Sequence, residues 1–547
     1  MAETDPVAFP TLDDAQLQRV AAFGRVRSVG AGEVLFTPSD DGYDFYALID
    51  TEVAIVHRGG DEDRVVARHG PGRFIGDLGL MTGAKPLLSA LVERAGSLVQ
   101  VTREDFRRML DAETELSRIV VDAFLARRAL LQQGEGAHIL RIIGSRFMPA
   151  ALRLRQYASR MRLPHVWEDL DEHPDVDALL ASVGVEPSDM PVVVTATGVL
   201  RNPTPGELAE ALGLSYRPVP GRVYDVAVVG AGPAGLAAAV YAASEGLSAV
   251  VLDAVGPGGQ AGSSSMIENY LGFPSGISGR ELTDRATAQA QKFGVSITSP
   301  CEAAALEVGS EFHAIRLQGE VEVPARVVVV ATGASYRRLP LDDWERFEGA
   351  GIYYSATEIE SRACTNRSVV VIGGGNSAGQ AALYLAEHAV RVDIVVRRDG
   401  LEETMSRYLT ARIDADPRIT VRPRTEVTGV YGDEVLREVD LSDEKGTERV
   451  DCAGLFCFIG ADAATKWLPA EVQLDRAGFV LTDRDVVREA LGDQAAGERE
   501  VLPYESSVPG VFAVGDVRHG STKRVAAAVG EGSAAIRSAH LYLAERG

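Results

Sequence analysis

Two glycine-rich loops constrain the fold of this chain more than any other feature. The first begins at Gly230 and the second at Gly373, and each follows an apolar run and precedes a segment of small residues. A strand, a glycine loop and a helix in this order form half of a dinucleotide-binding unit. The chain is therefore predicted to be an α/β protein with two such units, each built on a parallel sheet.

The first loop reads GAGPAG and has its glycines in the order G-x-G-x-x-G. The first glycine permits a tight turn, the second lets the backbone approach a pyrophosphate at the helix N-terminus, and the third allows close packing of helix on strand. Asp253 ends the next apolar run, where a carboxylate can accept hydrogen bonds from ribose hydroxyls. The loop residues are Gly230, Gly232, Pro233, Ala234 and Gly235.

The second loop reads GGGNSA, and no acid follows its second apolar run. Arg397 and Arg398 stand there instead, which favours a 2′-phosphate and hence NADPH over NADH. A solvated basic strand end is the alternative interpretation. Two dinucleotide units in one chain suggest that one holds a flavin and the other a nicotinamide. The loop residues are Gly373, Gly374, Gly375, Asn376 and Ser377.

Composition excludes several classes of protein. A length of 547 residues gives an expectation of about three or four domains. The formal charge of −23 disfavours nucleic acid or an anionic membrane as a partner. The four cysteines form no C-x-x-C pair, and no apolar stretch approaches the ~20 residues of a membrane span. With no signal peptide evident at the N-terminus, we expect a cytoplasmic protein without a metal site.

Two modules are predicted before the dinucleotide units. Residues 1–131 contain short alternating runs typical of an antiparallel β-roll, and they close with two helices that break near residues 112–114. Residues 132–216 follow the order β-α-β-α-β-β-α, which predicts a small α/β sandwich. A linker rich in proline and arginine, RPVPGR, covers residues 217–222.

Residues 222–547 resemble the low-molecular-weight thioredoxin reductases. The resemblance implies an FAD domain in two segments, 222–337 and 465–547, with an NAD(P)H domain, 338–464, inserted between them, and a homodimer. The matching pieces are GAGPAG (230–235), GGQ (258–260), IENYLGFP (267–274), ATGAS (331–335), GGGNSA (373–378), RRDG (397–400) and VFAVGD (511–516). It also implies that FAD contacts Gly259, Gln260, Asn269, Thr332, Gly333, Gly515, Asp516, Lys523, Arg524 and Val525.

The redox dithiol of that family is absent from this sequence. The two positions of the family's C-x-x-C fall on Ser355 and Glu358, and a hydroxyl and a carboxylate cannot exchange with a disulfide. Cys452 and Cys457 flank an apolar run and are expected to be buried rather than a redox couple. Glu402 stands where the family often has a further arginine, so NADH also stays open as a donor.

Residues 1–131 resemble a cyclic-nucleotide-binding domain through the cassette GRFIGDLGLMTGAKPLLSALV (72–92). By this resemblance Gly76 and Asp77 would contact the ribose and Ser89 the phosphate. Pro86 occupies the position of the phosphate-pairing arginine, whose loss is costly in a desolvated site. Binding of a cyclic nucleotide therefore competes with a second interpretation, a degenerate β-roll used for dimerisation or regulation.

Residues 132–216 resemble a thioredoxin or glutaredoxin fold, with Met190-Pro191 at the place of its cis-proline. Residues 148–151 replace the redox C-x-x-C with Met, Pro, Ala and Ala. This module is therefore predicted to dock or space the other domains rather than carry electrons.

The whole architecture resembles the fused sensor/thioredoxin-reductase flavoproteins. It predicts an FAD-dependent NAD(P)H oxidoreductase whose electron acceptor is unknown: a partner protein, a quinone or small oxidant, or oxygen. One alternative is a weakly catalytic or non-catalytic regulatory protein that senses FAD and nucleotide. A ferredoxin– or flavodoxin–NADP reductase is a further alternative, since that enzyme also lacks the dithiol.

Overall fold

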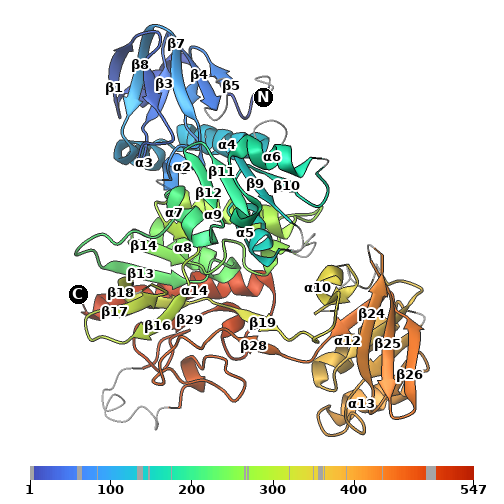
Figure 1. The fold of residues 1–547 in the computed structure, drawn as a ribbon. Coiled ribbons are helices and arrows are strands. Elements are labelled where there is room, and N and C mark those ends of the chain that lie inside the picture. The colour runs from blue at the N-terminus through green and yellow to red at the C-terminus, as the bar shows by residue number, and fades with distance from the viewer. Residues whose placement is uncertain are drawn as a thin grey trace. The chain divides into compact units, whose positions relative to one another are not determined.

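The chain divides into two compact units, each described here by itself (Figure 1). The first unit comprises Met1–Ser263, Ser278–Gly333 and Thr465–Gly547, and the second comprises Ser264–Ile277 and Ala334–Ala464. A computed structural model describes residues 5–57, 64–82, 84–131, 139–145, 148–173, 175–263, 267, 270–319, 321–348, 350–354, 356, 361, 364–389, 391–433, 435–487 and 500–546.

The first unit begins with an antiparallel β-roll of two four-stranded sheets, ordered β1-β8-β3-β6 and β2-β7-β4-β5. A helix precedes the roll, α2 follows β6, and α3 and α4 close the module (Figure 1). The predicted helix break near residues 112–114 is confirmed, because α3 ends at Ala112 and α4 begins at Thr114. The elements are α1 (Asp14–Ala21), β1 (Arg25–Val29), β2 (Val34–Phe36), β3 (Phe45–Leu48), β4 (Glu52–His57), β5 (Arg64–His69), β6 (Phe74–Ile75), α2 (Leu78–Thr82), β7 (Ser89–Arg94), β8 (Gly96–Val101), α3 (Arg103–Ala112) and α4 (Thr114–Leu131).

A small α/β module follows, and its elements come in the predicted order. Its sheet has the order β10-β9-β11-β12, in which β9 and β10 are parallel and β11 is antiparallel to both its neighbours. The Met190-Pro191 peptide bond is cis. The elements are β9 (Leu140–Gly144), α5 (Pro149–Arg160), β10 (His165–Asp169), α6 (Val176–Val183), η2 (Pro187–Asp189), β11 (Val192–Thr195), β12 (Gly198–Arg201) and α7 (Pro205–Ala211).

The remainder of the first unit is built on a seven-stranded sheet, β15-β14-β13-β18-β17-β16, with β29 paired to β18. β13, β14, β15, β18 and β29 are parallel, and their apolar side chains pack with α8 and α14 in one core. The elements are β13 (Tyr224–Val229), α8 (Pro233–Ser244), β14 (Ala249–Leu252), η3 (Ala261–Ser263), α9 (Gly279–Lys292), β15 (Ser296–Thr298), β16 (Ala303–Glu307), β17 (His313–Leu317), β18 (Glu322–Val330), η4 (Asp483–Asp485), β29 (Val511–Ala513), η6 (Gly515–Val517) and α14 (Val525–Arg546).

Helix α9 connects this sheet to both N-terminal modules. Its residue Ala288 is a member of the β-roll core, together with Phe106 and Phe124. Asp284 of α9 forms an ion pair with Arg162, which follows α5 of the small α/β module. The three parts of the first unit therefore share buried contacts.

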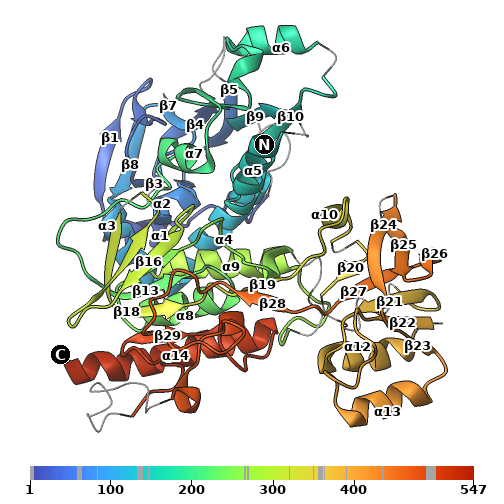
Figure 2. The same ribbon diagram turned by 60° about the horizontal axis from the view of Figure 1, so that its bottom comes forward.

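The second unit contains a five-stranded parallel sheet, β20-β27-β21-β22-β23, beside a three-stranded antiparallel sheet, β24-β25-β26 (Figure 2). The first and last strands of this unit, β19 and β28, pair with each other in antiparallel orientation. The elements are β19 (Ala334–Tyr336), α10 (Trp344–Phe347), β20 (Ile352–Tyr353), β21 (Ser368–Ile372), α12 (Asn376–Ala386), β22 (Arg391–Val395), α13 (Arg407–Ala415), β23 (Ile419–Arg422), β24 (Glu426–Gly432), β25 (Leu436–Asp443), β26 (Gly446–Asp451), β27 (Gly454–Cys457) and β28 (Ala461–Ala463). Among the helices of the described residues, none combines the length and the apolar composition that a membrane crossing requires.

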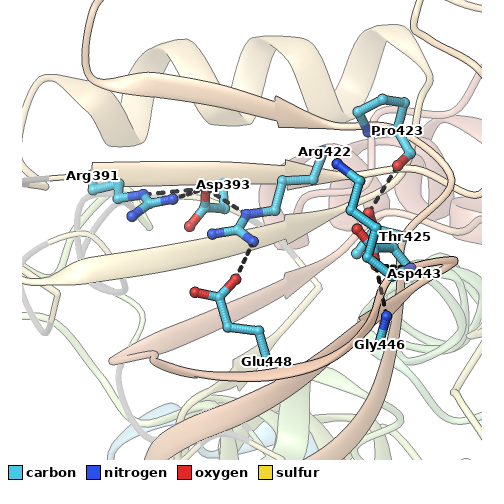
Figure 3. Close-up of polar contacts among 9 residues, drawn as sticks. Arg391, Asp393, Arg422, Pro423, Thr425, Asp443, Gly446 and Glu448 are labelled. Atoms are coloured by element: carbon cyan, nitrogen blue, oxygen red, sulfur yellow. Dashed lines mark hydrogen bonds and ion pairs between the residues drawn. The ribbon is translucent and has the colours of Figure 1, made fainter.

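A buried carboxylate ties the edge of the parallel sheet together (Figure 3). Asp393 of β22 is 4% exposed, and its Oδ1 accepts hydrogen bonds from Arg391 Nη2 at 2.9 Å and Arg422 Nε at 3.1 Å. Arg422 Nη1 also donates to Glu448 Oε2 at 2.7 Å, which joins β23 to β26. The strand that leads toward Arg397 and Arg398 is thereby fixed to β23, and through Arg422 to β26.

Replacing Asp393 by Asn should destabilise this unit, because two guanidinium groups would lose their shared charge. The loss is expected to be about 2 kcal/mol, below the ~3–5 kcal/mol of a fully buried pair, because the Arg391 side chain is 45% exposed. Glu448→Gln is the matched control, and it should cost much less than D393N because Glu448 is 63% exposed. Urea unfolding of the full chain measures both variants, and equal midpoints for D393N and the unmodified chain would contradict the prediction.

Candidate functional site

The sheet of the first unit brings four separate sequence motifs to one edge. Val229 of β13 lies beside Leu252 of β14 and Val330 of β18, and Val330 lies beside Ala513 of β29. All four strands are parallel, so the segments after their carboxyl ends are neighbours. These segments are the loop from Gly230, Asp253, the Ala331-Thr332-Gly333 turn and the Gly515-Asp516 turn. Ligands of doubly wound sheets bind at this kind of edge.

Gly230 and Gly235 occupy positions that no larger residue can fill. Gly230 has φ +108°, and a Cβ there would lie 2.3 Å from the carbonyl oxygen of Ala331. A Cβ on Gly235 would lie 1.9 Å from the carbonyl oxygen of Gly230. Helix α8 therefore approaches the loop and the ATG turn as closely as backbone atoms permit, as the sequence predicts for the first and third glycines of the motif.

The GGQ turn lies over the start of α8. Gly232 is the N-cap of α8, and a Cβ on Gly259 would lie 2.8 Å from the Cα of Gly232. The Gly258 amide donates to the carbonyl oxygen of Ala231 at 2.8 Å. Gly232 and the Gly258-Gly259 pair thus face each other without side chains. The first amide groups of α8, which have no helical partner, lie at this point. Such a cradle of bare backbone fits the pyrophosphate of a dinucleotide.

Asp253 follows β14 directly and fastens the glycine loop. Its Oδ2 accepts from the Ala231 amide at 2.7 Å, and its Oδ1 accepts from the amides of Val255 and Gly256 at 2.9 and 2.7 Å. A carboxylate has about four acceptor sites. Three are used by the backbone, so one is left for the ribose hydroxyl that the sequence predicts as its partner.

A buried glutamate holds the C-terminal turn in place. Glu531 of α14 is 7% exposed, and its Oε2 accepts from the Gly515 amide at 2.7 Å and from Arg518 Nε at 3.2 Å. Its Oε1 accepts from Arg518 Nη2 at 2.7 Å and from Ser521 at 3.1 Å. Burial raises the pKa of the neighbouring Asp516 carboxyl, and Lys523 opposes that shift. Sequence reasoning missed Glu531, because its place between two glycines does not reveal that its carboxylate reaches the Gly515 amide.

The other predicted FAD residues lie at or near the same edge where they are described. Gly333 and Gly515 both have positive φ, at +69° and +72°. Lys523 and Arg524 are exposed and immediately precede α14, which begins at Val525. Gln260 is exposed at the end of the GGQ turn. Asn269 lies outside the described residues.

The second glycine loop has the same construction in the second unit. Gly373 has φ +134°, and a Cβ there would lie 2.5 Å from the carbonyl oxygen of Phe458. Gly375 is the N-cap of α12, where Asn376 and Ser377 are exposed in the first turn. Asn376 Oδ1 accepts from the Ser406 amide at 2.8 Å, which fastens the loop to the segment before α13.

Three arginines gather at the end of β22 rather than the two that the sequence indicated. Arg397 and Arg398 are exposed just beyond the strand. The Arg424 amide donates to the carbonyl oxygen of Arg398 at 2.9 Å, and its guanidinium pairs with Asp399. Arg398 Nη1 lies 3.2 Å from Glu403 Oε2. Arg424 was missed because it follows the third strand, and only the sheet brings it beside Arg398.

Removing both predicted arginines should weaken NADPH selectively. We expect R397A/R398A to raise KM for NADPH by about tenfold or more, because charge-assisted hydrogen bonds to a 2′-phosphate are worth ~1.5–3 kcal/mol each. KM for NADH should change by less than about twofold, because NADH has no such phosphate. The charge-matched control is R412A/R418A, which removes two exposed arginines of the same unit. Equal losses for both nucleotides in steady-state kinetics would refute a role in reading the phosphate.

Comparison with known proteins agrees with this geometry. The family model for pyridine nucleotide-disulphide oxidoreductases matches residues 224–532, which is more than half of the chain. The chain belongs to the pyridine nucleotide-disulphide oxidoreductase family. A second model, for the cyclic nucleotide-binding domain, matches residues 26–113. The predicted fusion of a sensor-type β-roll with an oxidoreductase of two dinucleotide-binding units is thereby confirmed.

Similar proteins of this oxidoreductase family include several named thioredoxin reductases. NADPH-dependent thioredoxin reductase 3 of Arabidopsis thaliana is 34% identical over 59% of this chain, and the match spans 58% of that protein. Thioredoxin reductase of Listeria innocua is 31% identical over 59% of this chain and 95% of its own length. The crystal structure of thioredoxin reductase from Streptococcus pyogenes is similar with a TM-score of 0.52 and 28% identity, covering 59% of this chain and 99% of that one.

All four cysteines of this oxidoreductase are buried, and none of them forms a disulfide. Burial raises the pKa of Cys452 to about 12 and that of Cys457 to about 11, so neither is a thiolate near neutral pH. Both residues belong to one apolar core cluster, as expected for small buried hydrophobes. Ser355 and Glu358, at the positions of the family's dithiol, lie outside the described residues.

The small α/β module has no thiol at the position of its predicted redox motif. Met148 is the N-cap of α5, Pro149 opens the helix and Ala151 is fully buried against the module core. These side chains provide packing but no group that transfers electrons.

Of the β-roll residues singled out by the sequence, Gly76 and Asp77 line one cavity, and Ser89 is not among the residues that line it. Asp77 accepts from the Tyr43 hydroxyl and the Gly79 amide, and its Oδ2 pairs with Arg128 at 3.1 Å. Gly76 has φ +153° and faces the Phe124 ring. Ser89 is fully buried in β7, and its hydroxyl has no hydrogen-bond partner among the described residues. Asp77 is therefore already engaged by protein groups.

Proposed function

We propose that this chain is an FAD-dependent NAD(P)H oxidoreductase that passes electrons to an acceptor without a dithiol of its own. The observation that carries the proposal is the combination of two intact dinucleotide cradles with four buried cysteines that form no disulfide. In this family a dithiol relays electrons from the flavin. A chain without it needs an acceptor that does not require thiol exchange.

Each cradle supplies defined groups to its ligand. The amides at the start of α8 would hold the FAD pyrophosphate, and Asp253 would accept from its ribose. Glu531 acts as a positioning residue, because it fixes the Gly515 amide and with it the turn that contains Asp516. Lys523 and Arg524 would place positive charge near the flavin and stabilise its anionic reduced form. Bound FAD supplies the two-electron chemistry that the side chains themselves cannot perform.

The nicotinamide cradle would hold NADPH in preference to NADH. The amides at the start of α12 would receive the pyrophosphate, and Arg397 and Arg398 would receive the 2′-phosphate, with Arg424 beside them. The formal charge of the whole chain is −23, so this basic cluster is a local exception.

The N-terminal β-roll would regulate the flavin site through α9. This helix shares Ala288 with the β-roll core. A Cβ on Gly258 of the GGQ turn would lie 3.1 Å from the Thr283 hydroxyl of the same helix. A shift of the β-roll therefore acts on an element that touches the FAD loop. We propose also the domain order of residues 1–131, 132–216, 222–337 with 465–547, and 338–464, and a homodimer.

Anaerobic reduction of the flavin tests the proposal. The purified chain should be yellow, and its flavin absorbance should bleach with NADPH faster than with NADH. Reoxidation by quinones, oxygen, ferredoxin, flavodoxin and thioredoxin then ranks the acceptors. A flavin that stays oxidised with both nucleotides would favour the regulatory, non-catalytic alternative. Reoxidation by ferredoxin or flavodoxin far faster than by the others would favour the NADP reductase alternative.

A further inference from the structure

The β-roll contains a cavity of about 70 Å³ between its two sheets and α4. Its wall is mostly apolar and includes Phe36, Ile55 and Leu88. Four side chains interrupt this wall with hydrogen-bonding or charged atoms, namely Tyr43, His69, Asp77 and Arg127. The cavity lies within the β-roll module, and none of its lining residues belongs to either dinucleotide cradle.

The cavity is a poor match for a cyclic nucleotide. It has about half the volume of the ~150 Å³ apolar cavity that accepts one benzene ring, whereas a nucleotide contains a fused ring system, a sugar and a phosphate. Asp77, which would bind the ribose, is already engaged by Tyr43, Gly79 and Arg128. Pro86 forms part of the wall and offers no cation to a phosphate.

Arg127 gives the wall an excess of positive charge. It is 5% exposed and donates to the carbonyl oxygens of Ala8, Gly76 and Phe74 at 2.7, 2.9 and 3.1 Å. Three of its five N–H groups are used in this way, which leaves two. Among the described residues no carboxylate forms an ion pair with it, and Asp77 is paired with Arg128 instead. Two guanidinium groups thus face one carboxylate.

His69 is a second group with unused hydrogen-bonding capacity. It is 3% exposed, lies on β5, and its Nδ1 is buried without a hydrogen-bond partner among the described residues. Burial lowers the pKa of His69 well below its usual range, and the nearby Arg127 and Arg73 lower it further. The ring is therefore neutral near pH 7 and can donate one hydrogen bond. A buried polar atom without a partner destabilises the fold, and a ligand acceptor would remove that cost.

We propose that this cavity binds a small apolar monocarboxylate, with its carboxylate on Arg127 and His69 and its short aliphatic chain against the apolar wall. A carboxylate neutralises the excess guanidinium and accepts from both unused donors. The volume limits the apolar part to a few carbon atoms unless the wall moves. The site is independent of the proposed redox function, because none of its residues belongs to either cradle.

The bound molecule would lie beneath the interface with the small α/β module. Leu88 and Leu131 line the cavity and also belong to the core cluster that contains Leu154 and Leu208 of that module. A ligand that binds only the folded state stabilises it by RT ln(1 + [L]/Kd). Binding should therefore raise the melting temperature of the N-terminal part of the chain.

Calorimetric titration of the full-length holoprotein tests the site. The probes are propionate, butyrate and pentanoate, each beside its amide, together with cyclic AMP and cyclic GMP. We expect at least one carboxylate to bind and to raise the melting temperature, and its amide to bind about tenfold or more weakly. Equal binding of acid and amide, tighter binding of a cyclic nucleotide, or no binding of any carboxylate would each overturn the proposal.

Two variants locate the binding. His69→Leu removes the polar donor and should weaken the carboxylate at least about fivefold, the loss of one charge-assisted hydrogen bond. Ala67→Leu fills the cavity from the same strand and should abolish binding whatever the ligand chemistry. Val65→Ala on the exposed side of β5 is the control and should bind as the unmodified chain does. Unchanged carboxylate binding in A67L would show that the ligand binds elsewhere. The A67L result decides the question even if H69L fails to fold.

Discussion

The unmodified chain is expected to reduce an aromatic disulfide dye or thioredoxin at least about 100-fold more slowly than a S355C/E358C double variant. The reason is chemical: the two electrons of a reduced flavin pass to a disulfide only through a thiol pair, and these positions hold a hydroxyl and a carboxylate. The four native thiols are buried, and the pKa values of Cys452 and Cys457 are raised to about 12 and about 11. Dye reduction with NADPH under anaerobic conditions measures the effect.

The single variants S355C and E358C are the matched controls. Each introduces one thiol, which cannot close an intramolecular disulfide, so both should stay near the rate of the unmodified chain. Flavin reduction by NADPH should be similar in all four proteins, since neither substituted position belongs to the glycine motifs in the sequence. Rapid dye reduction by the unmodified chain would show that the electrons leave by a thiol after all.

The second large effect is expected at Gly532, where α14 crosses α8. A Cβ at this position would lie 2.1 Å from the carbonyl oxygen of Ala234 and 3.1 Å from the Ala238 amide. Gly532→Ala should therefore push α14 away from the start of α8 and lower the free energy of unfolding by at least about 2–3 kcal/mol. Ala234 belongs to the FAD loop, so the FAD content of the purified protein should also fall below about half of the native value.

Gly530→Ala provides a control in the same helix. A Cβ at Gly530 would meet nothing within 4 Å, and alanine is favoured over glycine in a helix by about 1 kcal/mol. This variant should keep its FAD and unfold at an equal or slightly higher denaturant concentration. The two substitutions are chemically identical and flank Glu531, so opposite signs of the stability change isolate the close approach of the helices. Equal signs would contradict it.

The glycine motifs were predictable from sequence because their chemistry is local. A positive φ at Gly230 and the backbone contact at Gly235 follow from a strand, a turn and a helix that are adjacent in the chain. The convergence of GAGPAG, ATG and GD on one edge was also foreseeable, since parallel strands place their carboxyl ends together. The break between α3 and α4 near residues 112–114 was predictable for the same reason, from helical spacing alone.

The groups that hold these motifs in place were not predictable. Glu531 lies on α14 and accepts a hydrogen bond from the Gly515 amide in the preceding turn. Arg424 lies beside Arg398 only because β22 and β23 are neighbouring strands. Asp77 matches its family motif in sequence, yet Tyr43 and Arg128 engage it in the fold. No pattern along the chain encodes such contacts, because they depend on which side chains from distant segments share one buried space.

The sequence by itself determined the two dinucleotide units, the β-roll before them and the missing C-x-x-C, because each of these is a matter of residue type at fixed spacing. Only the tertiary structure decided the burial of each group and its remaining capacity to form hydrogen bonds. It buried all four thiols, engaged Asp77 within the β-roll and left His69 and Arg127 with unused donors around a small cavity. The physical reason is that burial and pairing set the charge and hydrogen-bonding capacity of a side chain, and both arise from packing between segments far apart in the chain.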